Sequence, residues 1–211
     1  MGRKSHWKKV WTNNQETEVS WFQEKPAMSL ELIRQYAGVH QETILDVGGG
    51  SSRLVDALLE EKFRRVGVMD IAEPALKAAQ TRLGDRAKLV EWIEADVLYY
   101  TPNHEWDVWH DRAVFHFLTE SSDRALYVQT VAKTLSPSGL MVISTFGPEG
   151  PTRCSGLDVM RHSADSLLDA FGAGFEVVES RYEIHHTPDN KEQQFVYSVF
   201  RRGGVEGHGD A

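Results

Sequence analysis

Short apolar runs alternate with stretches of helical period between residues 43 and 146 of this chain. The apolar runs predict strands at 43–47, 65–70, 87–96, 106–111 and 139–146. In the intervening segments, apolar side chains recur every three or four residues, which predicts helices at 52–62, 73–83 and 121–135. Strands that alternate with helices are typical of a doubly wound α/β domain with a mostly parallel sheet.

The pattern changes after residue 146. A loop rich in glycine and proline is followed by a predicted helix at 163–172, for which Ser163 is a candidate N-cap. Two strands are then predicted at 175–186 and 193–202, with the turn residues TPDN in the short link between them. Strands with so short a link pair antiparallel, so we expect the sheet to end in an antiparallel pair.

The domain organisation follows from the same pattern. Residues 1–40 predict one or two helices that cap the domain, and residues 41–202 form the main domain. Residues 203–211 offer nothing to bury, so they are predicted to be a disordered tail.

Composition excludes several classes of function. The 211 residues carry a net charge of -8, which argues against a nucleic-acid partner. Cys154 is the single cysteine, so an internal disulfide and a thiolate zinc site are excluded. No apolar run predicts a membrane span or a signal peptide. We therefore expect a cytoplasmic protein with no membrane partner and no metal, and the oligomeric state stays open.

The stretch TILDVGGGSSRL places three glycines directly behind the first predicted strand. Ligands of open parallel sheets bind at the carboxyl ends of the strands, and glycines let the backbone approach a ligand closely. The dinucleotide pattern G-x-G-x-x-G requires a third glycine where this chain has Arg53, and the phosphate-loop pattern is absent. Both observations argue against NAD, FAD and nucleoside triphosphates.

An acid lies at or next to the end of each of the first three predicted strands. Asp46 would repel a phosphate and attract a cationic group. Asp70 is placed to accept the hydroxyls of a ribose, and Asp96 could accept the amino group of an adenine. Ile71 and Val97 follow these acids and are expected to pack on the ring. The acids together predict a nucleoside ligand with a positive charge and no phosphate.

These residues resemble the class I S-adenosylmethionine-dependent methyltransferases, in the motifs DVGGG, VMDIA, EADV and SPSGLMVIS. Ser52 stands at the last glycine place of the usual D-x-G-x-G-x-G run. The resemblance implies a Rossmann-like sheet of seven strands with an antiparallel last strand, and S-adenosylmethionine as cofactor, released as S-adenosylhomocysteine. The expected cofactor-binding residues are Trp21, Asp46, Val47, Gly48, Gly49, Gly50, Asp70, Ile71, Asp96, Val97 and Asp111.

The segment WHDRAVFHFL, at the end of the fourth predicted strand, holds the catalytic candidates. His110, Asp111 and Arg112 could supply a base and a cation that holds an anionic acceptor. In the alternative interpretation, Asp111 and Arg112 cap the next helix and form surface pairs. The Asn/Asp-Pro-Pro-aromatic run of many N-methyltransferases is absent, which argues against planar amide acceptors.

The N-terminal segment is similar to the aromatic lids of small-molecule thiol methyltransferases and of the elongation-factor lysine methyltransferases. Trp21 and Phe22 are expected over the methionine end of the cofactor, whereas Trp7 and Trp11 could instead cover the sheet edge. We therefore expect methyl transfer to a small-molecule thiol, selenol or other soft or anionic nucleophile. The alternatives are a protein lysine methyltransferase, weakened by Ala113 where that family has glycine, and a non-catalytic binding module.

Overall fold

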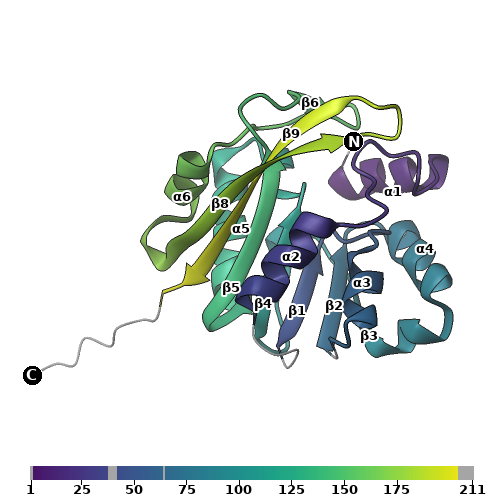
Figure 1. Ribbon diagram of the computed structural model, residues 1–211, viewed down its shortest axis with the longest axis horizontal. Helices are drawn as coiled ribbons and strands as arrows, with labels where there is room; N and C mark the ends of the chain where they lie inside the picture. The colour runs from purple at the N-terminus through teal and green to yellow at the C-terminus, as the bar shows by residue number, and fades with distance from the viewer. Residues whose placement is uncertain (1, 38–41, 64, 204–211) are drawn as a thin grey trace, which may run out of the picture.

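Seven strands form one mixed sheet at the centre of the protein (Figure 1). The computed structural model describes residues 2–37, 42–63 and 65–203. The strands of the sheet are β1 (Thr43–Val47), β2 (Arg65–Asp70), β3 (Val90–Glu94), β4 (Trp106–Arg112), β5 (Leu135–Phe146), β8 (Phe175–His186) and β9 (Glu192–Arg202). Their order is β3-β2-β1-β4-β5-β9-β8, and β9 runs antiparallel to both of its neighbours. The predicted sheet with its antiparallel last strand is confirmed.

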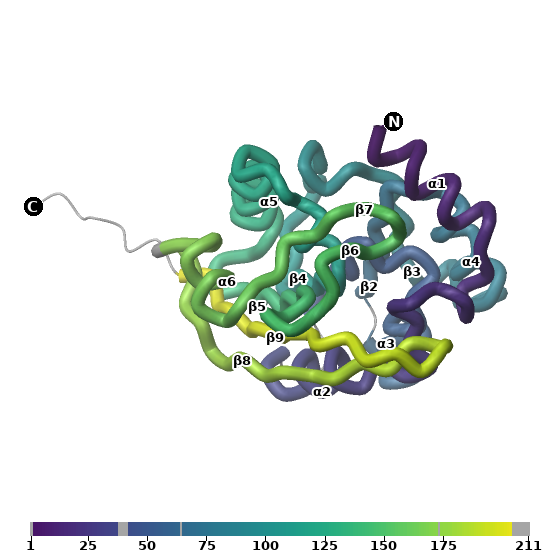
Figure 2. The backbone as a smooth tube through the Cα atoms, turned by 90° about the horizontal axis from the view of Figure 1, so that it is seen from above, coloured from purple at the N-terminus to yellow at the C-terminus, as the bar shows by residue number. Residues whose placement is uncertain are grey.

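Helices cover both faces of the sheet. The first face carries α2 (Ala27–Tyr36), α3 (Leu54–Glu60) and α4 (Glu73–Leu83). The opposite face carries α5 (Ser121–Thr134) and α6 (Ala164–Phe171). A further helix, α1 (Arg3–Asn13), lies beside α4 at the edge where the parallel strands end (Figure 2). The domain is therefore doubly wound, and its N-terminal cap contains two helices.

Short elements join these layers. They are the 3-10 helices η1 (Gly84–Leu89), η2 (Val97–Tyr99), η3 (Phe115–Phe117) and η4 (Gly172–Gly174), and the small hairpin β6 (Arg153–Cys154) and β7 (Leu157–Asp158). The hairpin and α1 lie over the same edge of the sheet (Figure 2). These two segments flank the region where the glycine-rich turn begins.

Several predicted boundaries differ from the structure, and the two largest differences lie at the starts of β3 and β5. Residues 87–89 belong to η1 and not to β3, and the indole of Trp92 fixes this turn by donating a hydrogen bond to the carbonyl of Ala87 at 2.9 Å. β5 begins at Leu135, four residues before the predicted start, and Ser138 takes a positive φ of 63° within it. The predicted cap of α6 is confirmed, since the side chain of Ser163 accepts from the backbone N–H of Ser166.

The chain changes direction across the sheet between β1 and β4. From β1 it proceeds outward to β2 and β3, and then returns so that β4 lies on the other side of β1. In open sheets the crevice at such a reversal is where ligands bind. The carboxyl ends of β1 and β4 carry Val47 and Arg112 to this point.

Some sequence predictions fall outside the described residues. The predicted boundary between residues 40 and 41 lies there, as do residues 204–211 of the predicted tail. The division into cap, main domain and tail thus stays a prediction. Within the described ranges, no helix has the length and apolar character needed to cross a membrane.

Candidate active site

A cavity opens at the carboxyl ends of β1, β2, β3 and β4. It brings together many of the predicted site residues from separate segments, namely Trp21, Val47, Gly48, Asp70, Ile71, Asp96, Val97 and Arg112. A second hollow adjoins it beneath the glycine-rich turn and is lined by Phe22, Asp46, Gly49 and His110, among others. Trp11, Trp21, Gly48 and Arg112 line both. The predicted site is therefore one continuous region of the sheet edge.

The glycine-rich turn requires glycine for two reasons. Gly48 has a φ of +65°, and a Cβ there would lie 2.0 Å from Cγ2 of Val114. Gly50 has a φ of +47°, and its Cβ would lie 2.9 Å from Oδ2 of Asp70. Residues with a side chain rarely adopt such positive φ values. Both the backbone conformation and the lack of space therefore exclude residues larger than glycine. The turn thereby brings its backbone against the acid that ends β2.

Asp46 presents an unsatisfied oxygen beneath this turn. Its Oδ1 lies 2.7 Å from Nδ1 of His110, whereas Oδ2 is buried and has no hydrogen-bond partner among the described residues. A Cβ on Gly49 would lie 2.6 Å from that Oδ2. Because a buried carboxylate oxygen without a partner is costly, its position fits a cationic or hydrogen-bond-donating ligand.

The side chain of Asp70 is fixed next to the glycine-rich turn. Its Oδ1 accepts a hydrogen bond from the backbone N–H of Ala72 at 2.7 Å. Burial raises the pKa of Asp70 to about 7, and the neighbouring charge of Asp46 contributes to the rise. A strongly shifted carboxyl group in a cavity is a common property of functional sites.

Asp96 is the N-cap residue of η2 and faces α1. Its Oδ1 accepts from the backbone N–H of Leu98 at 3.1 Å, and its Oδ2 lies 3.6 Å from Nε of Arg3. Arg3 also lines the cavity and donates to Asp123 at 2.9 Å. Sequence analysis missed Arg3, because no local pattern relates it to acids so far along the chain.

Three tryptophans form an aromatic roof over the cavity, defined by Trp7, Trp11 and Trp21. The ring centroids of Trp7 and Trp21 are 6.0 Å apart, and those of Trp11 and Trp21 are 5.8 Å apart, both edge to face. Trp7 also contacts Phe117, which follows β4, at 4.9 Å. All three line the cavity, so Trp7 and Trp11 do more than cover the sheet edge. Phe22 instead lies against the guanidinium of Arg53 beside the second hollow.

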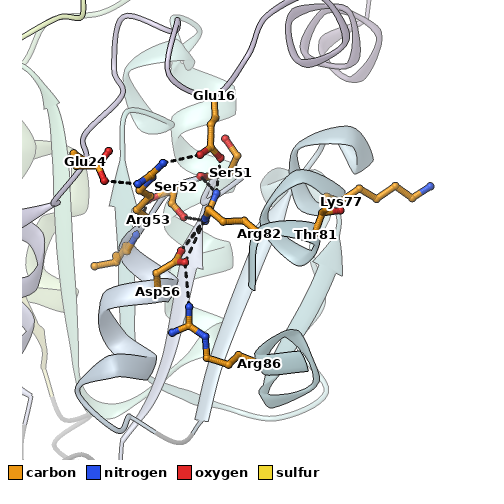
Figure 3. Close-up of polar contacts among 11 residues, drawn as sticks. Glu16, Glu24, Ser51, Ser52, Arg53, Asp56, Lys77, Thr81, Arg82 and Arg86 are labelled. Carbon is orange, nitrogen blue, oxygen red and sulfur yellow. Dashed lines mark hydrogen bonds and ion pairs between the residues drawn. The ribbon is translucent and has the colours of Figure 1, made fainter. Parts of the chain in front are cut away.

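A cluster of ion pairs fastens the link between α1 and the roof residue Trp21 (Figure 3). Glu16 of this link pairs with Arg53 at 3.0 Å and with Arg82 of α4 at 2.5 Å. Arg82 also donates to the carbonyl oxygens of Ser51 and Ser52 at 2.9 Å each. Glu16 and Arg82 therefore tie the roof to the glycine-rich turn, an arrangement that sequence analysis missed.

Glu16→Gln is expected to increase the rate at which S-adenosylhomocysteine dissociates by about fivefold, because it removes the charge that two arginines share. Stopped-flow fluorescence of the roof tryptophans measures this rate. Glu24→Gln is the matched control, since Glu24 is exposed and pairs with Arg53 alone among the described residues. Equal dissociation rates for the two variants would contradict a role of Glu16 in holding the roof.

The catalytic candidate Asp111 is enclosed in the protein. It accepts hydrogen bonds from the backbone N–H groups of Val114 at 2.8 Å and Phe115 at 3.2 Å, and from the hydroxyl of Tyr127. Burial raises the pKa of Asp111 to about 6. It lines neither hollow, and its contacts fix the turn after β4, as the capping alternative expects.

Arg112 is the catalytic candidate that faces the cavity. Its Nε donates to the hydroxyl of Tyr197 at 2.9 Å, and its Nη1 donates to the carbonyl of Trp21 at 3.0 Å. The guanidinium carbon lies 4.4 Å from the centroid of the Phe195 ring. Its Nη2 is buried without a hydrogen-bond partner among the described residues. One donor of Arg112 is thus left for a ligand.

His110 has a different environment from the one expected of a base. Only 3% of its surface is exposed, and each ring nitrogen has a partner, Asp46 on one side and the hydroxyl of Ser29 on the other. Cys154 lines the cavity, but burial raises the pKa of its thiol. The thiol therefore stays protonated, which disfavours a nucleophilic role.

The sequence resembles known methyltransferases. Residues 45–141 match the family model described as a methyltransferase domain. The ubiquinone biosynthesis O-methyltransferase of Hydrogenovibrio crunogenus is 28% identical over 120 residues, which cover 56% of this chain and 48% of that protein. The human N-terminal Xaa-Pro-Lys N-methyltransferase 1 is 32% identical over 127 residues, which cover 56% of each chain. The chain spans about half the length of these curated relatives.

Solved structures share the fold. A SAM-dependent methyltransferase from Anabaena variabilis matches with a TM-score of 0.76 at 16% identity, covering 96% of each chain. The N-methyltransferase NodS from Bradyrhizobium japonicum, in complex with S-adenosyl-L-homocysteine, matches with a TM-score of 0.71 at 15% identity, covering 95% of this chain and 99% of NodS. Residues 45–141 thus match a methyltransferase-domain family model, and the chain shares the fold of solved S-adenosylmethionine-dependent methyltransferases.

Proposed function

We propose that the protein transfers the methyl group of S-adenosylmethionine to a small-molecule nucleophile, a thiol, selenol or other soft or anionic acceptor. The observation that carries the proposal is Arg112, which lines the cavity beneath the aromatic roof with its Nη2 buried and unpaired among the described residues. An acceptor that fits under the chain's own tryptophans and neutralises this donor is small and anionic.

The residues at the sheet edge fit this cofactor. The unpaired Oδ2 of Asp46 suits the cofactor's ammonium group, because a buried carboxylate oxygen is stabilised by a cation. Asp70 would accept hydrogen bonds from the ribose hydroxyls, and Asp96 from the amino group of the adenine. Ile71 and Val97 line the cavity and offer apolar contact to the ring.

When bound, S-adenosylmethionine supplies a methyl group on a sulfonium, which is already activated toward nucleophiles. The protein's task is then to align the acceptor and exclude water. The roof tryptophans enclose the cavity, and their ring faces favour a positive charge. Methyl transfer to an aligned acceptor requires no dedicated base when the acceptor is bound as an anion.

Arg112 would favour an ionised acceptor. A guanidinium beside a thiol or selenol stabilises its anion and so increases the fraction that can attack. A neutral acceptor would leave Nη2 unpaired next to the positive charge of the cofactor, which is unfavourable in a buried cavity. The charge at this position therefore selects for acceptors that carry a negative group.

A protein amine is the second candidate acceptor. It is favoured by the human relative, which is named for methylating an N-terminal Xaa-Pro-Lys sequence. A single extended peptide end could enter a roofed cavity, whereas a folded surface could not. The two candidates differ in where the methyl group finally resides.

The decisive experiment incubates the protein with methyl-labelled S-adenosylmethionine and a cell extract divided into small-molecule and protein fractions. Label is expected in the small-molecule fraction. Label found only in the protein fraction would replace the proposal by protein methylation. Binding of S-adenosylhomocysteine without any transfer of label to either fraction would favour the non-catalytic binding module.

Arg112→Gln is expected to lower kcat/KM for the acceptor by about 100-fold, since loss of a buried charge-assisted hydrogen bond costs about 2 to 3 kcal/mol. The affinity for S-adenosylhomocysteine is expected to change only a few fold. Steady-state kinetics with the labelled acceptor fraction measures the first, and calorimetry the second. Arg153→Gln is the control, because Arg153 is exposed and does not line the cavity. An unchanged kcat/KM would contradict the role of Arg112.

A further inference from the structure

We propose that the outer edge of β8 is a self-association surface, through which two copies of the protein pair their β8 strands antiparallel to form one continuous sheet. The two-fold axis of this dimer would pass through the contact between the two Tyr182 side chains. No residue of β8 lines either hollow of the site, so this surface is independent of the proposed function.

β8 is the last strand of the sheet and has one open edge. It pairs with β9 on its inner side, and no other backbone hydrogen bond joins it to the described part of the chain. The unpaired N–H and C=O groups of an edge strand can pair with another strand. The register with β9 shifts at Val178, near the start of β8, whereas residues 179–186 pair with β9 without interruption. This regular stretch is the template for a second strand.

The exposed apolar side chains of the protein are concentrated on this strand. Of the seven large apolar side chains that are exposed among the described residues, four belong to β8, namely Val177, Val178, Tyr182 and Ile184. Tyr182 and Ile184 are 52% and 49% exposed, and they share one face of the strand with Ser180 because alternate residues point the same way. An exposed apolar row on a long edge strand is typical of an interaction surface.

The opposite face of the same stretch is charged. Glu179, Arg181 and Glu183 alternate with the apolar row and so point to the other side of the sheet. Arg181 pairs with Glu31 of α2 at 2.5 Å and with its neighbour Glu179. The Oε2 of Glu183 is buried and has no hydrogen-bond partner among the described residues. Glu183 therefore lacks the cation that a buried carboxylate oxygen requires.

These two rows select one register. A two-fold axis at Tyr182 places Arg181 opposite Glu183 of the second copy, and it repeats this pair on the other side of the axis. The same register places Ile184 opposite Ser180 and diagonally beside the Tyr182 of the second copy, so the apolar side chains cover one another.

Other registers are unfavourable. Moving the axis by one residue places Arg181 opposite its own copy in one direction, and Glu183 opposite its own copy in the other. Like charges directly opposite each other destabilise a strand pair. Larger shifts shorten the part of residues 179–186 that can pair. The sequence of β8 is thus complementary to itself in a single register, which favours a second copy of this chain as the partner.

Sedimentation velocity tests the association. The unaltered protein is expected to show monomer and dimer in exchange, with a dimer fraction that rises with concentration, because a contact of one strand from each copy is small. Tyr182→Lys brings two positive charges together on the axis and should raise the dissociation constant of the dimer more than about tenfold. Leu89→Lys is the matched control, since Leu89 is 62% exposed on η1, which adjoins the opposite edge strand β3.

Two outcomes would overturn the self-association. One is an unaltered protein that stays monomeric up to millimolar concentration. The other is a Tyr182→Lys variant that dimerises as strongly as Leu89→Lys. Both substitutions are at exposed positions, and equal melting temperatures of the two variants would verify that each is folded.

Disulfide cross-linking tests the register. Residues directly opposite each other in an antiparallel pair have Cα atoms about 4.5 to 5.5 Å apart, which is within the range that a disulfide spans. Tyr182→Cys should therefore form a covalent dimer under a mild oxidant. Ile184→Cys should not, because its two copies would lie four residues apart along the strands, about 13 Å. Equal yields from the two variants, or a higher yield from Ile184→Cys, would overturn the proposed axis. The buried Cys154 is common to both variants.

Discussion

Asp70→Asn is expected to stabilise the ligand-free protein at pH 8 and to weaken its binding of S-adenosylhomocysteine by more than about tenfold. Burial raises the pKa of Asp70 to about 7, so at pH 8 the folded protein holds a charge in a place that disfavours it. Asparagine has nearly the same shape and can still accept from the N–H of Ala72. It removes the charge, and with it the stronger acceptor that we propose for the two ribose hydroxyls.

The pH dependence follows from the same shift. The folded protein retains a proton on Asp70 up to about pH 7, whereas the unfolded chain loses it near the ordinary aspartate pKa of 3.8. Between these values the folded state binds more protons, so its stability falls as the pH rises. The shift corresponds to destabilisation on the order of 4 kcal/mol once Asp70 is fully ionised. Asp111, with its pKa raised to about 6, contributes in the same direction below pH 6.

Thermal unfolding between pH 4 and 8, with and without S-adenosylhomocysteine, measures both effects. Without ligand, Asp70→Asn should unfold several degrees higher at pH 8 and should show a smaller decline with pH. Asp85→Asn is the control, because Asp85 is exposed on η1 and should leave both curves unchanged. A lower melting temperature for Asp70→Asn at pH 8, or undiminished affinity, would refute the explanation.

Gly48→Ala is expected to lower the free energy of unfolding by about 2 to 4 kcal/mol. Part of the loss is backbone strain of about 1 to 2 kcal/mol at a φ of +65°. The rest arises because the new Cβ would lie 2.0 Å from Cγ2 of Val114, so the turn and the segment after β4 must separate. Denaturation by urea measures the difference.

Gly156→Ala separates the two contributions. Its φ is +78°, and a Cβ there meets nothing within 4 Å, so only the strain remains. Val114→Ala combined with Gly48→Ala should recover part of the lost stability by relieving the contact. If Gly48→Ala and Gly156→Ala lowered the free energy of unfolding equally, the close approach of Val114 would contribute nothing to the loss.

The parts of the fold that the sequence predicts best are those with both a clear period and clear ends. β1, β2 and α4 occur at the predicted residues. The two strands are continuous apolar runs, and Pro74 marks the start of the helix, so no other structure competes with them. The start of β3 could not be predicted, since the η1 turn depends on the bond from Trp92 to Ala87.

The site shows the same division. Asp46, Asp70 and Asp96 could be predicted as neighbours, because parallel strands end at one edge of a sheet. The partners of His110 and Glu16 could not, since these contacts depend on how α2 and α4 pack against residues distant in sequence. These partners are determined by the direction of side chains in three dimensions, which hydrophobic periodicity does not predict.

The aromatic roof has a consequence for the order in which a ribosome completes the site. Arg3 of α1 contacts Asp123, 120 residues later in the chain, and Trp7 packs on Phe117. Translation proceeds from the N-terminus, so α1 is synthesised long before these contact residues. A nascent chain can hold the cofactor beneath its roof only after α5 has left the exit tunnel. Ligand capture is therefore a late event of synthesis, although α1 is made well before the rest of the site.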